Sequence, residues 1–307
     1  MIHAYSLDKL DLKNSWLTIG VFDGVHRGHQ QIIEKLTAGA HQVNAPAVVL
    51  TFWPHPAIVL GTSEVKSLTL PDERAQLLFD LGVDVVITQT FDHSVANTSA
   101  LEFAERLKVH LGLRQLLMGY DFALGKGREG NAARLTEIGL QLGYSVEVIS
   151  AVSDESGVIS STEIRKLVRT GDVTEASRLL GRPYSLHGQV IHGDGRGRAL
   201  GIPTANIDYS RDKVIPSNGI YAGWAYIGAE KHPTMMNIGI NPTFTPEKQT
   251  PNVEAYLLDF DRDIYDQDLK VEFVRRLRDE LKFPSVDALI AQILVDVEQG
   301  RKILTGN

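Results

Sequence analysis

The chain has 307 residues, a formal net charge of −7 at pH 7 and no cysteine, and 43% of its residues are hydrophobic. This length and apolar content favour two domains, each with its own core. The acidic charge disfavours sequence-independent binding to nucleic acid, and the lack of cysteine excludes disulfides and thiolate metal sites. No membrane-spanning run and no secretory signal is visible, so we expect a cytoplasmic protein.

In the first half of the chain, short β-rich runs alternate with amphipathic helical patterns. This alternation predicts a parallel sheet with right-handed crossovers, that is, a Rossmann-like α/β domain. Ligands of such sheets bind beyond the carboxyl ends of the strands. We predict strands over residues 17–21, 47–52, 83–88, 115–118 and 145–149, and helices over residues 30–38, 71–81, 99–110 and 131–142.

The first predicted strand ends in a glycine-containing turn, GVFDGVHRGH, that carries two histidines. On a helix that begins near Val25, His26 and His29 lie on the first turn. Free backbone N–H groups and the helix dipole favour an anion there, and two imidazoles can stabilise a phosphate whose charge grows in a transition state. Gly20 and Gly24 allow the backbone to approach a ligand closely. The spacing alone also fits a solvated helix face or half of a metal site.

Three later segments of this half follow predicted strands and carry polar or stiff loops. In TFWPHP, two prolines flank His55, which indicates either a rigid turn or a loop that contacts ligand. Asp121 lies in the glycine-rich GYDFALGKGREG, which is typical of a flexible connection or of a loop that orders over phosphates. In ISSTEIRKL, Ser161 and Thr162 begin a helix and Arg165 adds positive charge. Ordinary capping and anion binding both fit this pattern.

The pattern changes after Gly181-Arg182-Pro183, so we predict domains at residues 1–182 and 183–307. The second half contains β-hairpin patterns joined by short turns, typical of a small antiparallel β-barrel. A final amphipathic helix with Ser285 as N-cap is expected to pack across the barrel through an apolar stripe. We predict strands over residues 184–192, 220–227, 231–237, 253–258 and 269–274, and the stripe comprises Val286, Leu289, Ile290, Ile293, Leu294 and Val297.

One segment of the second half, HGDGRGRALGIPTANI, combines four glycines with hard oxygen ligands. Gly193 and Gly201 belong to a loop able to wrap a polyphosphate with its backbone N–H groups, although a long β-turn fits equally well. Thr204 and Asn206 supply the oxygen atoms that magnesium prefers. Further on, alternation along the strand places Glu254 on the face opposite its two neighbours, and on the pattern alone it is an exposed strand glutamate.

These motifs, in this order, resemble the prokaryotic bifunctional riboflavin kinase/FAD synthetase family, whose N-terminal half belongs to the nucleotidylyltransferase superfamily. The resemblance implies that Mg-ATP phosphorylates riboflavin to FMN in the C-terminal domain, and that a second ATP adenylylates FMN to FAD in the N-terminal domain. Two positions depart from the family: Ala123 replaces an arginine and Tyr256 replaces a histidine.

The resemblance also implies roles for individual residues, and riboflavin, FMN and ATP as the ligands. Glu254 is the expected general base, and His26 and His29 stabilise the transferring phosphorus. The expected nucleotide-binding residues are Gly20, Phe22, Asp23, Gly24, Asp121, Ser161, Thr162, Arg165, Gly193 and Gly201, the flavin-binding residues are His55, Asn241 and Arg278, and the Mg²⁺ ligands are Thr204 and Asn206. The rival interpretations are another nucleotidylyltransferase with an appended barrel, and a flavin-binding regulatory protein without catalysis.

Overall fold

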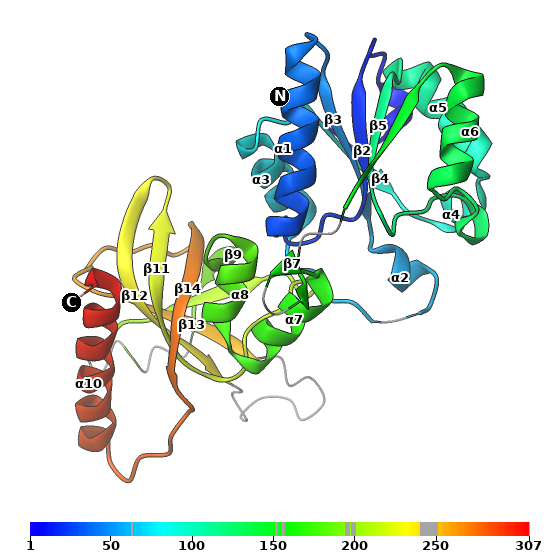
Figure 1. The fold of residues 1–307 in the computed structure, drawn as a ribbon. Helices are drawn as coiled ribbons and strands as arrows, with labels where there is room; N and C mark the ends of the chain where they lie inside the picture. Colours follow the sequence, from blue (N-terminus) through cyan, green and yellow to red (C-terminus); the bar gives the residue numbers. More distant parts are fainter. Residues whose placement is uncertain are drawn as a thin grey trace. The chain divides into compact units, whose positions relative to one another are not determined.

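The computed structural model describes residues 1–62, 64–150, 153–154, 157–193, 197, 201–239 and 251–306. It forms two compact units, Met1–Ser161 and Thr162–Asn307 (Figure 1). The domain boundary expected at residues 182/183 stays a prediction. In the described part of the chain, no helix has both the length and the apolar character needed to cross a membrane.

The first unit is built on six parallel strands in the order β1-β4-β3-β2-β5-β6, as the strand–helix alternation predicted. This order reverses between β2 and β5, so the carboxyl end of β2 lies at the topological switch point where ligands bind. The strands are β1 (Ile2–Ala4), β2 (Trp16–Ile19), β3 (Ala47–Trp53), β4 (Val85–Thr90), β5 (Gln115–Gly119) and β6 (Ser145–Ile149).

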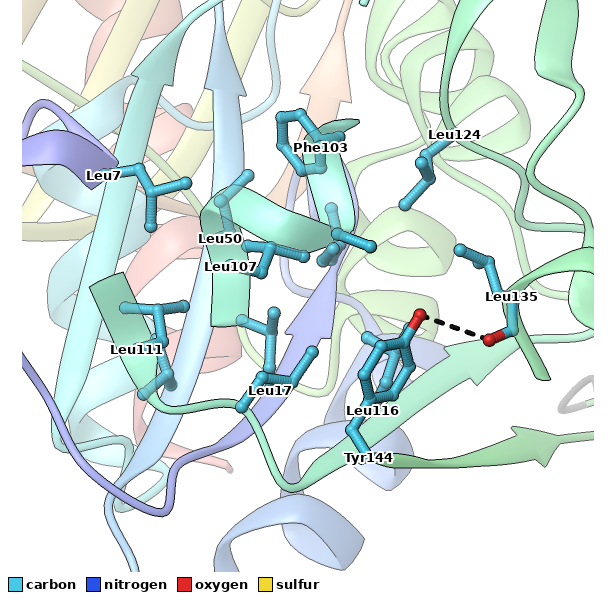
Figure 2. Packing of buried hydrophobic residues seen from close by; sticks show 14 of the residues in the cluster. Leu7, Leu17, Leu50, Phe103, Leu107, Leu111, Leu116, Leu124, Leu135 and Tyr144 are labelled. Atoms are coloured by element: carbon cyan, nitrogen blue, oxygen red, sulfur yellow. Dashed lines mark hydrogen bonds between the residues drawn. The ribbon is translucent and has the colours of Figure 1, made fainter. Parts of the chain in front are cut away.

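Helices cover both faces of this sheet (Figure 1). On one face, Val48 and Leu50 belong to a buried cluster with residues of α5 and α6, of which Figure 2 shows fourteen members. On the other face, Ala47 and Val49 pack with residues of α1 and α3. Successive residues of a strand point to opposite faces, which is why the buried run of β3 serves two cores. The helices are α1 (Arg27–Gln42), α2 (Pro56–Val59), α3 (Pro71–Asp80), α4 (His93–Asn97), α5 (Ala100–Leu111) and α6 (Ala132–Leu142).

Several short elements of this unit were not predicted. They include β1, the helices α2 and α4, and a small antiparallel pair. Each is too short to display a hydrophobic period. The pair consists of β7 (Ser153–Asp154) and β8 (Gly157–Val158), and two 3₁₀ turns cover Leu7–Lys9 and Lys126–Arg128.

The second unit contains a closed antiparallel barrel in the order β10-β13-β12-β11-β14-β9, which confirms the predicted barrel. The helices α7 (Ser161–Thr170) and α8 (Val173–Leu180) precede it, and α8 packs against β9 and β14. Strand β10 was missed, because its Ala-Asn-Ile-Asp-Tyr alternation follows directly on the glycine-rich loop. The strands are β9 (Tyr184–Ile191), β10 (Ala205–Tyr209), β11 (Gly219–Ile227), β12 (Glu230–Gly239), β13 (Asn252–Leu257) and β14 (Asp268–Arg278).

The last helix, α10 (Val286–Thr305), packs on the barrel with Ser285 as its N-cap, as expected. Its predicted apolar stripe is partly wrong, because Leu294 is 63% exposed and Val286 is 53% exposed. The face buried against the barrel instead carries Asp296 and Gly300. A Cβ atom at Gly300 would lie 2.4 Å from the Met235 sulfur, so the backbone of the helix approaches the barrel too closely there for a larger side chain.

Candidate active sites

The two histidines of the first unit lie at the start of α1, as the motif predicted. His26 is the N-cap, and its Nδ1 accepts a hydrogen bond of 3.3 Å from the His29 backbone N–H. The two imidazole rings stack with their centroids 3.6 Å apart. The Phe22 ring meets the His29 ring edge-on at 5.1 Å. The cap fixes the orientation of the buried His26 ring, so both imidazoles are held in place at the positive end of the helix dipole.

The loop between β2 and α1 has an unusual backbone. Phe22 has φ +48°, Gly24 has φ +82° and Val25 has φ +42°. A β-branched residue such as Val25 rarely adopts a positive φ, and such strain persists only where the surroundings impose it. The Asp23 carboxylate, 1% exposed, accepts hydrogen bonds from the backbone N–H groups of Leu68 and Thr69 at 3.0 and 2.9 Å. These contacts anchor the strained turn to the segment before α3.

Arg74 on α3, which was not predicted from the sequence, contacts both Asp23 and the segment before α3. Its side chain is fully buried, and its guanidinium donates hydrogen bonds of 2.9 Å to Thr51 Oγ1 and to the Thr69 carbonyl oxygen. Arg74 Nη2 lies 3.6 Å from Asp23 Oδ1. The guanidinium therefore joins the loop between β2 and α1 to the end of β3. We call this loop the histidine loop, because it leads into His26 and His29. The clue in the sequence was its position four residues before the buried Leu78, on the face of α3 that packs on the sheet.

We expect Arg74→Met to destabilise the first unit by about 3–5 kcal/mol, because it leaves the Asp23 carboxylate buried without its cation. FAD formation should fall with it, whereas FMN formation in the second unit should persist. Arg74→Lys keeps the positive charge but not the planar guanidinium with its several N–H donors. It should therefore give an intermediate loss of stability and of FAD formation. Urea unfolding and both activities measure this, with Arg134→Met on the exposed face of α6 as the control. Equal stability of the two methionine variants would contradict the anchoring role.

A cavity of about 630 Å³ opens beside the histidine loop. It is lined by Gly20, Phe22, His29, His55 and Asp121, so five residues predicted from three separate motifs meet there. The loop after β5 contributes further lining residues, including Ala123, which stands in the place of the family arginine.

The other predicted nucleotide-binding residues are not among those that line this cavity. The Asp23 side chain is used internally, and its carbonyl oxygen accepts a hydrogen bond of 2.9 Å from the Ser161 hydroxyl. Gly24 donates its N–H to Thr69 Oγ1 at 2.9 Å. Both residues therefore stabilise the backbone conformation of the loop through hydrogen bonds within the protein. Thr162 and Arg165 lie on α7, in the second unit.

In the second unit, three polar side chains form a row across neighbouring strands. Asn206 on β10 pairs in register with Glu254 on β13, and Glu254 pairs with Asn237 on β12. Paired residues of adjacent strands project from the same face. The neighbours of Glu254, Val253 and Ala255, are fully buried, which confirms that Glu254 lies on the opposite, outer face of the barrel wall.

The Glu254 carboxylate is held by two donors. Asn252 Nδ2 lies 2.9 Å from Glu254 Oε1, and Thr204 Oγ1 lies 3.3 Å from Glu254 Oε2. Asn252 Nδ2 also donates to Asn206 Oδ1 at 2.7 Å. Asn252 was missed, although its place two residues before Glu254 on the same strand puts both side chains on one face.

Glu254 lies in a wall between two cavities. The larger, of about 910 Å³, is lined by Gly193, Gly201 and Asn206 and by the rings of His192 and Tyr265, which are tilted at 30° with their centroids 3.8 Å apart. The smaller, of about 280 Å³, is mostly apolar. Thr204, Glu254 and Tyr256 line both cavities, and the apolar lining of the smaller one includes Ile220, Met235, Leu281, Phe283, Leu289 and Ile293.

Two glycines predicted around the larger cavity are needed for different reasons: Gly193 for lack of space and Gly201 for its backbone conformation. A Cβ atom at Gly193 would lie 2.1 Å from Asn206 Nδ2, so any larger residue displaces that amide. Gly201 has φ +73°, in the left-handed region. The glycine-rich segment between them falls largely outside the described residues.

The smaller cavity contains one of the two predicted flavin-binding residues of this unit. Arg278 lines it, and its guanidinium is held by the Asp296 carboxylate of α10 with Nη2–Oδ2 at 2.6 Å. Helix α10 therefore does more than pack across the barrel, because it also lines this cavity. Desolvation raises the pKa of the neighbouring Glu280 carboxyl, and the charge of Glu254 raises it further. The other predicted residue, Asn241, lies outside the described residues.

Comparison with known families and proteins agrees with this two-site layout. The FAD synthetase family matches residues 8–163, and the riboflavin kinase family matches residues 180–304. The bifunctional riboflavin kinase/FMN adenylyltransferase of Listeria monocytogenes is 37% identical over 97% of this chain and 95% of its own length. The Escherichia coli protein of the same name is 35% identical over 95% and 93%.

Among solved structures, the chain is similar to the crystal structure of a macrolide-efflux protein from Streptococcus pneumoniae. The TM-score is 0.89 at 31% identity, and the match covers 97% of this chain and 98% of the other. The matches to both families and the identity over almost the full length of the bacterial relatives lead to one conclusion: the chain belongs to the bifunctional riboflavin kinase/FMN adenylyltransferase family.

Proposed function

We propose that the second unit transfers the γ-phosphoryl group of ATP to the ribityl 5′-hydroxyl of riboflavin across the wall that contains Glu254. The carrying observation is that Glu254 faces both an apolar cavity, suited to a flavin ring, and a larger polar cavity, suited to ATP. The Glu254 carboxylate accepts the hydroxyl proton, the ribityl oxygen forms the new bond to phosphorus, and the bond to ADP breaks. Positioning and charge stabilisation supply most of the catalysis.

The oxygen atoms beside Glu254 fit a magnesium ion that is held jointly with ATP. Thr204 offers a hydroxyl and Asn206 an amide oxygen, and Mg²⁺ is usually bound by a few hard oxygens together with substrate phosphates. The described residues contain no cluster of three acidic, histidine or cysteine ligands, so phosphate oxygens would complete the coordination. Bound there, the ion would neutralise charge on the ATP phosphates. Gly193 and Gly201 let the backbone approach those phosphates.

In the first unit, we propose that the FMN phosphate attacks the α-phosphorus of a second ATP and releases pyrophosphate. His26 and His29 stabilise the charge on the transferring group, while Ser161 holds phosphates. The phosphate-binding roles expected for Thr162 and Arg165, which belong to the second unit, stay predictions. The nucleotide also contacts Gly20 and Asp121 and rests on the loop of Phe22, Asp23 and Gly24, and His55 contacts the flavin. On the kinase side, Arg278 and Asn241 contact the flavin. Small molecules rather than nucleic acid are thus the partners, and we place both reactions in the cytoplasm.

Isotope labelling tests both halves of this function in one vessel. With riboflavin and Mg²⁺, label from [γ-³²P]ATP should appear in FMN and FAD, whereas label from [α-³²P]ATP should appear in FAD but not in FMN. Chromatography of the flavins and assay of pyrophosphate measure this. Formation of neither flavin product would refute the proposal, and α-label in FMN would refute the assignment of two separate transfers.

Thr204→Val tests the magnesium assignment. The substitution keeps the shape of the side chain but removes the oxygen, so the Mg²⁺ concentration for half-maximal FMN formation should rise about tenfold, roughly 1.4 kcal/mol. The Mg²⁺ requirement for making FAD from supplied FMN should not change, and it serves as the internal control. An unchanged requirement in both reactions would remove Thr204 from the metal site.

A further inference from the structure

The cavity beside the histidine loop has one permanent positive charge in its described lining. Of the described residues that line it, Arg128 is the only lysine or arginine and Asp121 is the only acidic residue. A guanidinium stays charged at any physiological pH, whereas the imidazoles of His29 and His55 can lose their charge. A phosphomonoester carries roughly −1.5 to −2 charges at neutral pH. Any phosphate that enters this cavity therefore meets Arg128 as its one fixed counter-charge among these residues.

The Arg128 side chain reaches back to the end of β5. Its Nη2 donates a hydrogen bond of 2.7 Å to the Asp121 carbonyl oxygen, two residues after the strand ends at Gly119. Strand β5 is a neighbour of β2, so the guanidinium lies at the topological switch point of the sheet. The contact uses one of five N–H groups, and the side chain is exposed. N–H groups in a planar fork thus remain for an anion.

The turn that carries Arg128 is held against the start of α5. The first N–H of the Lys126–Arg128 turn donates to the Thr98 carbonyl oxygen at 2.9 Å, and the Glu129 carboxylate accepts a hydrogen bond of 2.7 Å from the Ala100 N–H. Arg128 itself has φ +61°, which residues with a side chain rarely adopt. Such strain persists only where the surroundings impose it, and it gathers at ligand sites. The turn therefore presents the guanidinium from a fixed backbone.

We propose that Arg128 binds a phosphate group of the substrates of FAD formation. The inference rests on the proposed function, in which ATP and FMN meet in this cavity. Contacts between arginine and phosphate are often bidentate, and they are roughly twice as strong as neutral hydrogen bonds. The phosphate belongs either to FMN or to the triphosphate of ATP, because both present the same chemistry to a guanidinium.

Kinetics of FAD formation from supplied FMN test the contact. Arg128→Met should raise KM for the substrate whose phosphate is bound roughly tenfold. Arg128→Lys should recover part of this loss, because it keeps the charge but not the fork. Lys126→Met is the matched control: it removes a charge from the same turn, but Lys126 is not among the residues that line the cavity, so both KM values should stay unchanged. Unchanged KM values in Arg128→Met would overturn the inference.

Analogues without phosphate separate a direct contact from a disturbed loop. Adenosine competes with ATP, and lumiflavin, the flavin ring without its ribityl phosphate, competes with FMN. A raised KM for ATP with an unchanged inhibition constant for adenosine would assign the contact to the triphosphate, and the same result with FMN and lumiflavin would assign it to FMN. Equal rises for a substrate and its analogue would assign Arg128 to the shape of the loop and overturn the inference. If the unaltered protein formed no FAD, the proposed function itself would fall, and this inference with it.

Discussion

Glu254→Gln should lower the rate of riboflavin phosphorylation by roughly 10²–10⁴-fold, the usual contribution of a general base. Glutamine keeps the size of the side chain and its contacts with Asn252 and Thr204, so the wall between the cavities should remain intact. It cannot take up the hydroxyl proton. The rate of FMN formation at saturating riboflavin and ATP measures the effect, and KM for both substrates should change little because the loss falls on the chemical step.

Two comparisons make the Glu254 result specific. Asp208→Asn removes a carboxylate from the same outer face of the barrel, two residues after Asn206, and should leave FMN formation unchanged. FAD formation from supplied FMN by the Glu254→Gln protein should equal that of the unaltered protein. If Glu254→Gln abolished both activities, the assignment of riboflavin phosphorylation alone to the second unit would be wrong.

The second large effect is expected at the start of α1. His26→Asn should lower FAD formation from FMN roughly 10²–10³-fold, the loss seen when one stabilising donor is removed from a charged transition state. Asparagine is itself a strong N-cap, so this substitution keeps the helix start while removing the imidazole. His29→Asn should show a loss of the same order. The double variant should lose less than the product of the single losses, because the stacked rings act as a unit.

His41→Asn provides the matched control for the histidine variants. His41 lies in the last turn of the same helix, and its half-exposed side chain contacts Asp84. FAD formation by that variant should be unchanged, and FMN formation should be unchanged in all the histidine variants. A full rate of FAD formation in the His26→Asn, His29→Asn double variant would rule out the proposed role of both imidazoles.

The sequence reveals elements where a repeating pattern is long enough to read. The five predicted strands of the first unit are all present, because apolar runs such as Ala47–Trp53 can only be buried strands or short buried helices. Strand ends shift by up to a few residues, as for β4, which runs from Val85 to Thr90. Strand β1 and the strand that carries Asn206 escaped because one is very short and the other follows a glycine-rich loop.

Residues expected to contact a ligand are easier to predict from the sequence than the residues that hold them in place. His29, His55 and Asp121 come from separate motifs, and the rule that ligands bind at the carboxyl ends of parallel strands predicted their meeting in one cavity. Arg74 and Asn252 act through three-dimensional hydrogen bonds to segments distant in sequence or to a neighbouring strand. Local patterns place Arg74 on the buried face of α3 and Asn252 on the face of Glu254, but they do not identify the partners that these side chains hold.

The wall shared by the two cavities of the barrel bears on inhibitor design. Because Thr204 and Glu254 face both sides, a compound that joins a flavin-like ring to an adenosine phosphate by a short bridge could occupy both cavities at once. Tethering makes the second binding event intramolecular, with effective concentrations of roughly millimolar for short flexible linkers. Such a bisubstrate ligand depends on the shared wall, because a short bridge could not join two pockets on opposite sides of a fold.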